Sequence, residues 1–363
     1  MRMHPSWIKR GPLVMAFALL IVPAITQDAR AANGTAATQA IVRTGDVDLF
    51  YRVYDYASGR PTAEQLQHEY LDQGSEGLRL FARLRNISGQ RIADAMAADP
   101  SLYSGAKRCL AVLPRARARL DDALHTLGRL YAEARFPPVT IAIGRGKPVA
   151  IGAPDTGIPV GLEALCATDW LNPDVEDRIV YVLAHEYVHV QQVRADPISR
   201  KDKPTVLEIS LLEGIAEFVD ELMTGHVAYS RNAATAAGRE REIETRFAVD
   251  LDKTDLSDWA YNATPGTPGD LGYWVGYRIA KASYRNAPDK RQALREILEM
   301  DDAKAFLANS GWHPGIDLEP DEAPSDSSLP GSVSNQSKIP VRMSQRRMLP
   351  RHVVATPTEG NPP

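Results

Sequence analysis

Residues 172–194 read NPDVEDRIVYVLAHEYVHVQQVR, and this stretch predicts a helix that carries two histidines one turn apart. Its Asn-Pro-Asp opening supplies a cap, a proline suited to the first helical turn and an early acidic residue. His185 and His189 lie on one face of such a helix, because residues four apart are neighbours. Both imidazoles can therefore reach a single ion, which is the geometry of a two-histidine zinc clamp.

Glu186 follows the first histidine and lies about 100° around the helix from it, since each helical residue turns by about that angle. Its carboxylate would therefore stand beside an ion held by the histidines, where it can act as general base to a metal-bound water. The alternative is a chance match, with the histidines merely packed or exposed. A third ligand is needed to decide in favour of a metal.

Residues 211–222, LLEGIAEFVDEL, predict a second helix that offers this ligand. Glu213 begins an acidic face, and large apolar residues make the opposite side. Such a face is usually solvated, but Gly214 and Ala216 are small and would let this helix approach the histidine helix closely. The two histidines and Glu213 would then leave a fourth position for water, as a catalytic zinc needs.

Glu217 lies one turn beyond Glu213, where it can accept a hydrogen bond from a ligand histidine and fix its tautomer. Two neutral imidazoles and one carboxylate suit a borderline-soft ion. The pattern therefore predicts one Zn²⁺ per chain.

Composition narrows the class of protein. The chain has 363 residues, 44% of them hydrophobic, which is enough for one large domain or two smaller ones. Its net charge of -4 shows no excess of basic residues, so nothing points to nucleic acid as a partner. Cys109 and Cys166 lack zinc-site spacing; an oxidising compartment permits them to pair, and two free thiols are equally consistent with the sequence.

The N-terminus has the order of a secretory signal peptide. Arg2, Lys9 and Arg10 precede the apolar run GPLVMAFALLIVPAI, and the small-residue segment ARAAN follows it. The alternative is a membrane anchor, but the run from Gly11 to Ile25 is shorter than the roughly 20 residues that cross a bilayer. We expect cleavage near residue 31, a periplasmic or secreted protein, and no stable membrane span after cleavage.

Apolar spacing and breaker residues predict the remaining elements. Residues 46–56, rich in aromatic and β-branched side chains, predict a short strand or an extended lead-in, and residues 62–135 predict a helical half. Strands or extended pieces are expected at residues 139–143 and 157–165, and helices at residues 205–224, from Leu271 onward and at residues 289–300. Beyond Pro314 the chain is rich in Pro, Ser and Asp and predicts a disordered tail.

HEYVH followed by EGIAEF resembles the gluzincin clan of zinc metallopeptidases. Flanking segments, among them VTIAIGRG, GIPVGLE and PGDLGYWVGYRIAKASY, resemble a bacterial family of predicted Zn-dependent proteases with a domain of unknown function. The resemblance covers roughly residues 46–312 and implies a zincin-like core and a protease class. It also implies an oxyanion donor, because some gluzincins use the tyrosine of Tyr-x-x-Gly, which Tyr273 to Gly276 matches. Alternatively, Tyr273 is a core aromatic.

Together these observations predict an α+β, mostly helical protein with a zincin-like catalytic core, a small edge sheet and a helical N-terminal half. The expected regions are a signal peptide at 1–31, a helical region at 32–135, the metallopeptidase core at 136–314 and the tail at 315–363. Peptide or protein is the expected substrate, and the layout of the clan that the sequence resembles implies that residues 139–143 form the edge to which it adds as a strand. The alternative is a non-catalytic zinc-binding protein of the cell envelope, which would not need Glu186.

Overall fold

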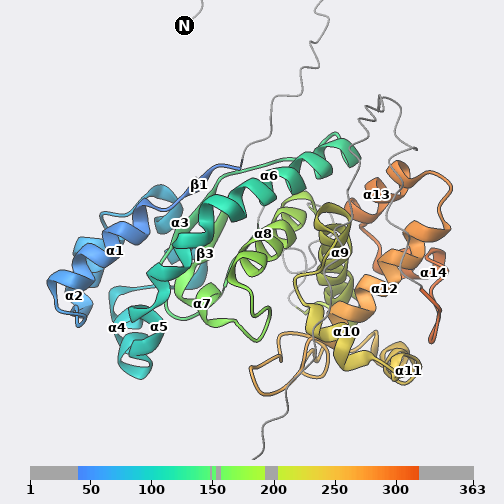
Figure 1. Cartoon of the computed structure of the whole chain (residues 1–363). Coiled ribbons are helices and arrows are strands. Elements are labelled where there is room, and N and C mark those ends of the chain that lie inside the picture. Colours follow the sequence, from blue (N-terminus) through green and yellow to red (C-terminus); the bar gives the residue numbers. More distant parts are fainter. Residues whose placement is uncertain (1–39, 148, 153–156, 193–202, 319–363) are drawn as a thin grey trace, which may run out of the picture. The chain divides into compact units, whose positions relative to one another are not determined.

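The computed structural model describes residues 40–147, 149–152, 157–192 and 203–318 (Figure 1). The chain divides into two units, one ending at Ile316 and the other comprising Asp317–Pro363. All the described helices and strands belong to the first unit. The predicted signal peptide and most of the predicted tail lie outside the described residues, so the division into regions stays a prediction.

Helices dominate the described residues, and a small sheet joins them, which confirms the expected α+β, mostly helical class. The helices before the sheet's second strand are α1 Gly45–Tyr56, α2 Ala63–Gln65, the π-helix Leu66–Leu71, α3 Glu76–Arg85, α4 Gly89–Ala98, α5 Pro100–Ser104, the 3-10 helix Ala106–Val112 and α6 Leu113–Leu130. Those that follow are α7 Leu162–Ala167, α8 Val175–Gln191, α9 Val206–Thr224, α10 Ser230–Ala236, α11 Glu240–Asp250, α12 Leu271–Asn286, α13 Lys290–Leu298 and α14 Ala303–Asn309.

The sheet has three parallel strands in the order β1 Val42–Arg43, β2 Val139–Ala142 and β3 Ile158–Gly161. β2 lies in the middle, with Val139 opposite Val42 on one side and Ile158 on the other. The expectation that this strand forms the substrate edge is therefore wrong. A short segment around Ala150 lies on the outer side of β3 and bridges antiparallel to Val160.

Residues 46–56 form most of helix α1 and not the expected strand. Aromatic and β-branched residues favour strands only weakly, and tertiary packing overrides such propensities. Val47, Phe50 and Tyr51 are buried, and Val53 follows them, which is the spacing of a helix that covers a core. The spacing of apolar residues was the better signal here than their type.

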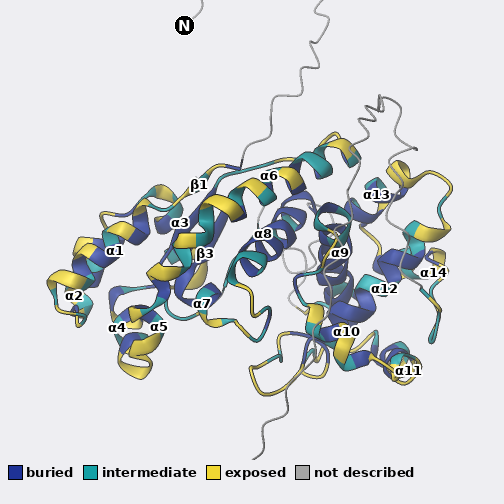
Figure 2. Cartoon of the chain, viewed as in Figure 1, coloured by how far each residue is buried: buried dark blue, intermediate teal, exposed yellow. Residues whose placement is uncertain are grey.

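The ends of α8 and α9 follow from their capping residues. The side chain of Asp174 accepts the backbone N–H of Asp177 at the start of α8. At the start of α9, Thr205 and Glu208 form a reciprocal capping box. Gly225 ends α9 with a left-handed φ of 79°, which glycine adopts without strain. Both helices lie close to the predicted bounds, and most of their residues are buried (Figure 2).

α9 packs against α12 through glycines. A Cβ added at Gly214 would meet backbone atoms of Gly276 and Tyr277, and one added at Gly276 would meet the carbonyl oxygen of Ser210. Gly214 therefore permits close approach to α12, and not to the histidine helix α8 as its place beside Glu213 suggested. This backbone contact sets where the carboxylates of α9 stand.

Cys109 and Cys166 are joined, with an S–S distance of 2.06 Å. The bond ties the 3-10 helix before α6 to α7, the helix that follows β3. Of the two possibilities that the sequence left open, the structure therefore has the disulfide.

Hydropathy and length together rule out a membrane span among the helices of the described residues.

Candidate metal centre

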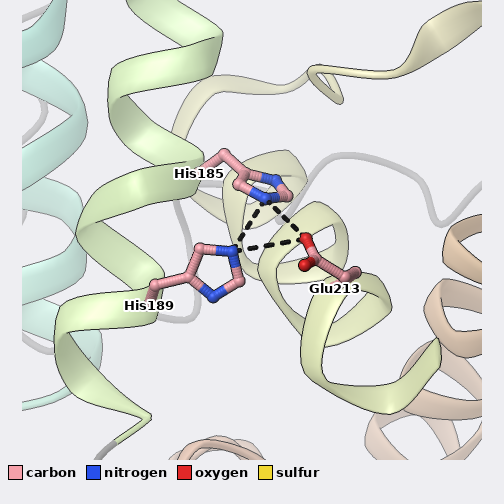
Figure 3. A group of neighbouring side chains, drawn as sticks. All are labelled: His185, His189 and Glu213. Carbon is pink, nitrogen blue, oxygen red and sulfur yellow. Dashed lines mark hydrogen bonds and ion pairs between the residues drawn. The ribbon is translucent and has the colours of Figure 1, made fainter. Parts of the chain in front are cut away.

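The structure brings His185 and His189 of α8 together with Glu213 of α9 (Figure 3). One donor atom from each residue lies within 4.8 Å of the other two. The two Nε2 atoms are 3.0 Å apart, and Oε2 of Glu213 lies 3.4 Å from each of them. Tetrahedral ligands that bind zinc at about 2.0–2.1 Å lie about 3.3–3.4 Å from one another. The observed triangle and its donor set therefore fit a zinc ion.

The second nitrogen of each imidazole has a partner of its own. Nδ1 of His185 lies 2.6 Å from Oε1 of Glu217, as the sequence predicted for that residue's position. Nδ1 of His189 lies 2.7 Å from Oε1 of Gln192, which sequence reasoning missed. The amide of Gln192 is fixed in turn, because it donates to the carbonyl oxygen of Leu212 at 2.8 Å. Both Nε2 atoms are thereby left to face Glu213.

Glu217 is also anchored on its other oxygen, which accepts the backbone N–H of Tyr229 at 2.9 Å. A cavity of about 350 Å³ is lined by Glu217 and Tyr229, and its other walls include Tyr181, His226 and Trp274. The three candidate ligands are not among the described residues that line it. The cavity is therefore a neighbour of the metal centre and not its coordination space.

The carboxylates and imidazoles of this buried cluster shift one another's pKa values. Burial lowers the pKa of His185, but Glu213 and Glu217 outweigh it and hold that pKa well above its ordinary value. Burial likewise lowers the pKa of His189, and Glu213 raises it on balance. Burial alone would raise the pKa of Glu213, yet the two histidines outweigh burial and lower it. The centre thus attracts positive charge, whether protons or a metal cation carry it.

Glu186 directly follows His185 on α8 and is partly exposed. Its Oε2 accepts the backbone N–H of Gly152, which follows the segment at the outer side of β3. A Cβ at Gly152 would collide with the carbonyl oxygen of Glu186, so only glycine permits this approach. The structure therefore places the candidate base next to the sheet's outer segment.

Tyr273, the tyrosine of the Tyr-x-x-Gly match, is 3% exposed and packs in a small cluster with Ile209 and Ala260. Its ring lies 5.0 Å from that of Tyr229, which lies 5.9 Å from the ring of His185. The surroundings of Tyr273 are those of a core aromatic, and its role as an oxyanion donor stays a prediction.

Tyr261 is a second residue that sequence reasoning missed. Its hydroxyl donates to Oε1 of Glu213 at 3.1 Å. The two residues are 48 positions apart, and Tyr261 lies in an irregular loop before α12. No periodic pattern relates such positions, so only the folded chain could reveal the contact.

Comparison with known families supports the same centre. The sequence model of a family described as predicted Zn-dependent protease (DUF2268) matches residues 165–306. That range contains α8, α9 and α12, and with them every candidate site residue. The chain therefore resembles this family, as its motifs led us to expect. No curated protein and no solved structure matches the chain.

Proposed function

We propose that this protein is an exported zinc-dependent metallopeptidase with a zincin-like core of the gluzincin kind. One observation carries the proposal: two imidazole nitrogens and one carboxylate oxygen converge from two helices, and Glu186 directly follows the first histidine on α8. A site that only stabilised the fold would need the ligands and not Glu186. The resemblance to predicted Zn-dependent proteases supports the same reaction class.

The residues of the site have three roles: they bind the metal, orient the imidazoles and transfer a proton. His185, His189 and Glu213 would hold the ion, and Glu217 and Gln192 orient the imidazoles. A bound zinc ion supplies a Lewis acid that polarises the substrate carbonyl and makes water more acidic. Glu186 takes the proton of the attacking water and returns it to the leaving amine.

Tyr273 is our candidate for the hydrogen bond to the oxygen of the attacked carbonyl. Its removal should reduce turnover more than substrate affinity if it contacts only that oxygen. Tyr273→Phe, assayed on a cleaved peptide for kcat and KM separately, tests this assignment.

Substrate would add as a strand to the outer segment of the sheet, residues 149–151, in place of the interior strand β2. This segment already pairs antiparallel with β3, and backbone pairing gives affinity with little demand on sequence. Gly152, which follows it, contacts Glu186. A peptide that pairs here would therefore run beside the candidate base.

Export is the part of the proposal that rests on the N-terminal sequence, with its basic residues, apolar run and small-residue segment. The disulfide between Cys109 and Cys166 agrees with an oxidising compartment. N-terminal sequencing of the protein from its native host tests the proposal: a start near residue 32 supports export, and an intact Met1 contradicts it.

The decisive experiment combines metal analysis with digestion of an unbiased peptide library. We expect about one zinc per chain and cleavage of part of the library. In the matched control, Glu186→Gln, zinc content and thermal stability should stay near those of the wild type, while hydrolysis falls by about 10²–10⁴-fold.

Two results would contradict the proposal. Wild-type activity in Glu186→Gln would exclude this residue as the base. A zinc-loaded wild type that cleaves nothing would favour the alternative, a zinc-binding protein of the cell envelope without catalytic activity.

A further inference from the structure

The two oxygens of Glu213 have different partners. Oε2 lies 3.4 Å from the Nε2 atoms of His185 and His189, whereas Oε1 accepts the hydroxyl of Tyr261 at 3.1 Å. A carboxylate can bind a metal through one oxygen or through both. A hydrogen bond to Oε1 engages that oxygen and leaves Oε2 as the ligand atom.

The backbone of Tyr261 has a left-handed φ of 58°. This conformation is rare and strained for a bulky residue, so surrounding structure must hold it. Burial of the ring does not account for it, because Tyr261 is 56% exposed. The strained backbone instead coincides with the placement of the Tyr261 hydroxyl against Glu213, the candidate ligand.

The loop that carries Tyr261 is locked from its far end. Oδ1 of Asp270 accepts the backbone N–H of Asn262 at 2.9 Å, and Oδ1 of Asn262 accepts that of Asp270 at 2.6 Å. A Cβ at Gly269 would collide with Asn262, so the two ends of this loop approach each other as closely as glycine allows. Asp270 itself is 5% exposed and directly precedes α12. The backbone next to Tyr261 is therefore fixed by the hydrogen bonds between Asn262 and Asp270.

We propose that Tyr261 is a positioning residue of the metal centre: it holds Oε1 of Glu213 so that Glu213 presents one oxygen to the metal. A single-oxygen ligand beside two histidines keeps the fourth position open for water, which a catalytic zinc requires. The inference rests on the metal centre of the proposed function, but not on which substrate is cleaved.

Zn²⁺ affinity, measured by competition with a chromophoric chelator, tests the proposal. Tyr261→Phe removes the hydroxyl and keeps the ring; we expect affinity to fall by about 10–100-fold, as it does when the partner of a metal ligand is lost. Tyr277→Phe is the matched control, because it removes a similar bond, 2.9 Å long, from the Tyr277 hydroxyl to Glu221 on the same helix. Its zinc affinity should stay within about twofold of the wild type.

A second variant separates positioning from folding. Tyr261→Gly relieves the left-handed backbone, so the metal-free protein should be at least as stable as the wild type. Its zinc affinity should nevertheless fall as in Tyr261→Phe. Co²⁺ in place of Zn²⁺ adds a spectroscopic measurement, since the visible absorption should change when both oxygens of Glu213 become available.

The outcomes separate this proposal from the proposed function. Unchanged zinc affinity in both Tyr261 variants overturns the positioning role, and so does an equal loss in Tyr277→Phe. If the wild type binds zinc but cleaves no peptide, peptidase activity fails, while a selective loss of affinity in the Tyr261 variants still supports the positioning role. A wild type that binds no zinc overturns both.

Discussion

The two faces of α9 contact their neighbours in opposite ways. Toward α8, Glu213 and Glu217 extend carboxylates whose oxygens lie 3.4 and 2.6 Å from nitrogens of His185. Toward α12, side chains are missing at the point of contact, because Gly214 and Gly276 bring the two backbones together. The α8 face acts through the groups that its side chains bind, whereas the closest approach to α12 depends on the absence of side chains at two glycines.

The difference shows how a fold divides tasks along one helix. The α12 face sets the position of α9, because contacts between backbones leave little freedom to shift. The α8 face can then present carboxylates at the distances that a metal needs. Variants on the two faces should therefore fail in different ways, one in metal binding and the other in stability.

The largest expected effect is on the α8 face. Glu213→Ala removes one of three candidate ligands, so zinc affinity should fall by at least about a hundredfold, more than the loss of a ligand's partner costs. His185→Ala should behave alike. Elemental analysis of the purified variants measures the effect, and full zinc retention in Glu213→Ala would move the ligand assignment to Glu217.

On the α12 face, Gly276→Ala should lower the free energy of unfolding by about 1–3 kcal/mol, because its Cβ meets the carbonyl oxygen of Ser210. Gly45→Ala is the matched control: Gly45 also lies in a helix, with nothing within 4 Å of an added Cβ. Its effect should stay within about 0.5 kcal/mol. Urea unfolding of both variants measures the difference, and equal stability would refute the close contact between the helices.

Gln192→Ala sharpens the comparison by removing a residue between the two helices. Its amide contacts His189 on α8 and Leu212 on α9. Zinc affinity should fall by about tenfold, since His189 loses the group that orients it. Chelator competition measures this, and an affinity equal to that of the wild type would show that Gln192 only packs.

The last test concerns the pH dependence of zinc binding. The carboxylates raise the pKa values of His185 and His189, so protons compete with a metal for these imidazoles up to a higher pH than at an ordinary histidine. Protons and zinc compete below these pKa values, so affinity should fall as pH falls, by up to about tenfold per pH unit for each proton displaced. Calorimetry in two buffers of different ionisation enthalpy counts the protons released. A zinc affinity that does not fall as the pH falls would contradict the raised pKa values.

Much of the centre could be predicted because it lies on helices. Regular spacing placed His185, His189 and Glu186 on α8, and apolar spacing with breaker residues predicted the ends of α9 closely. Tyr261 could not be predicted, since its loop has no period and its contact with Glu213 spans 48 residues. The packing partner of Gly214 could not be predicted either. A small residue indicates that another segment packs closely against it, but not which segment that is.

By itself, the sequence determined the helices that carry the candidate ligands, because helical periodicity and caps are local properties of the chain. It also indicated two histidines and a carboxylate suited to zinc. Only the tertiary structure decided that β2 lies inside the sheet and that α9 packs on α12 through glycine. These outcomes depend on contacts between residues far apart in the chain, and such contacts override local preference wherever burial is at stake.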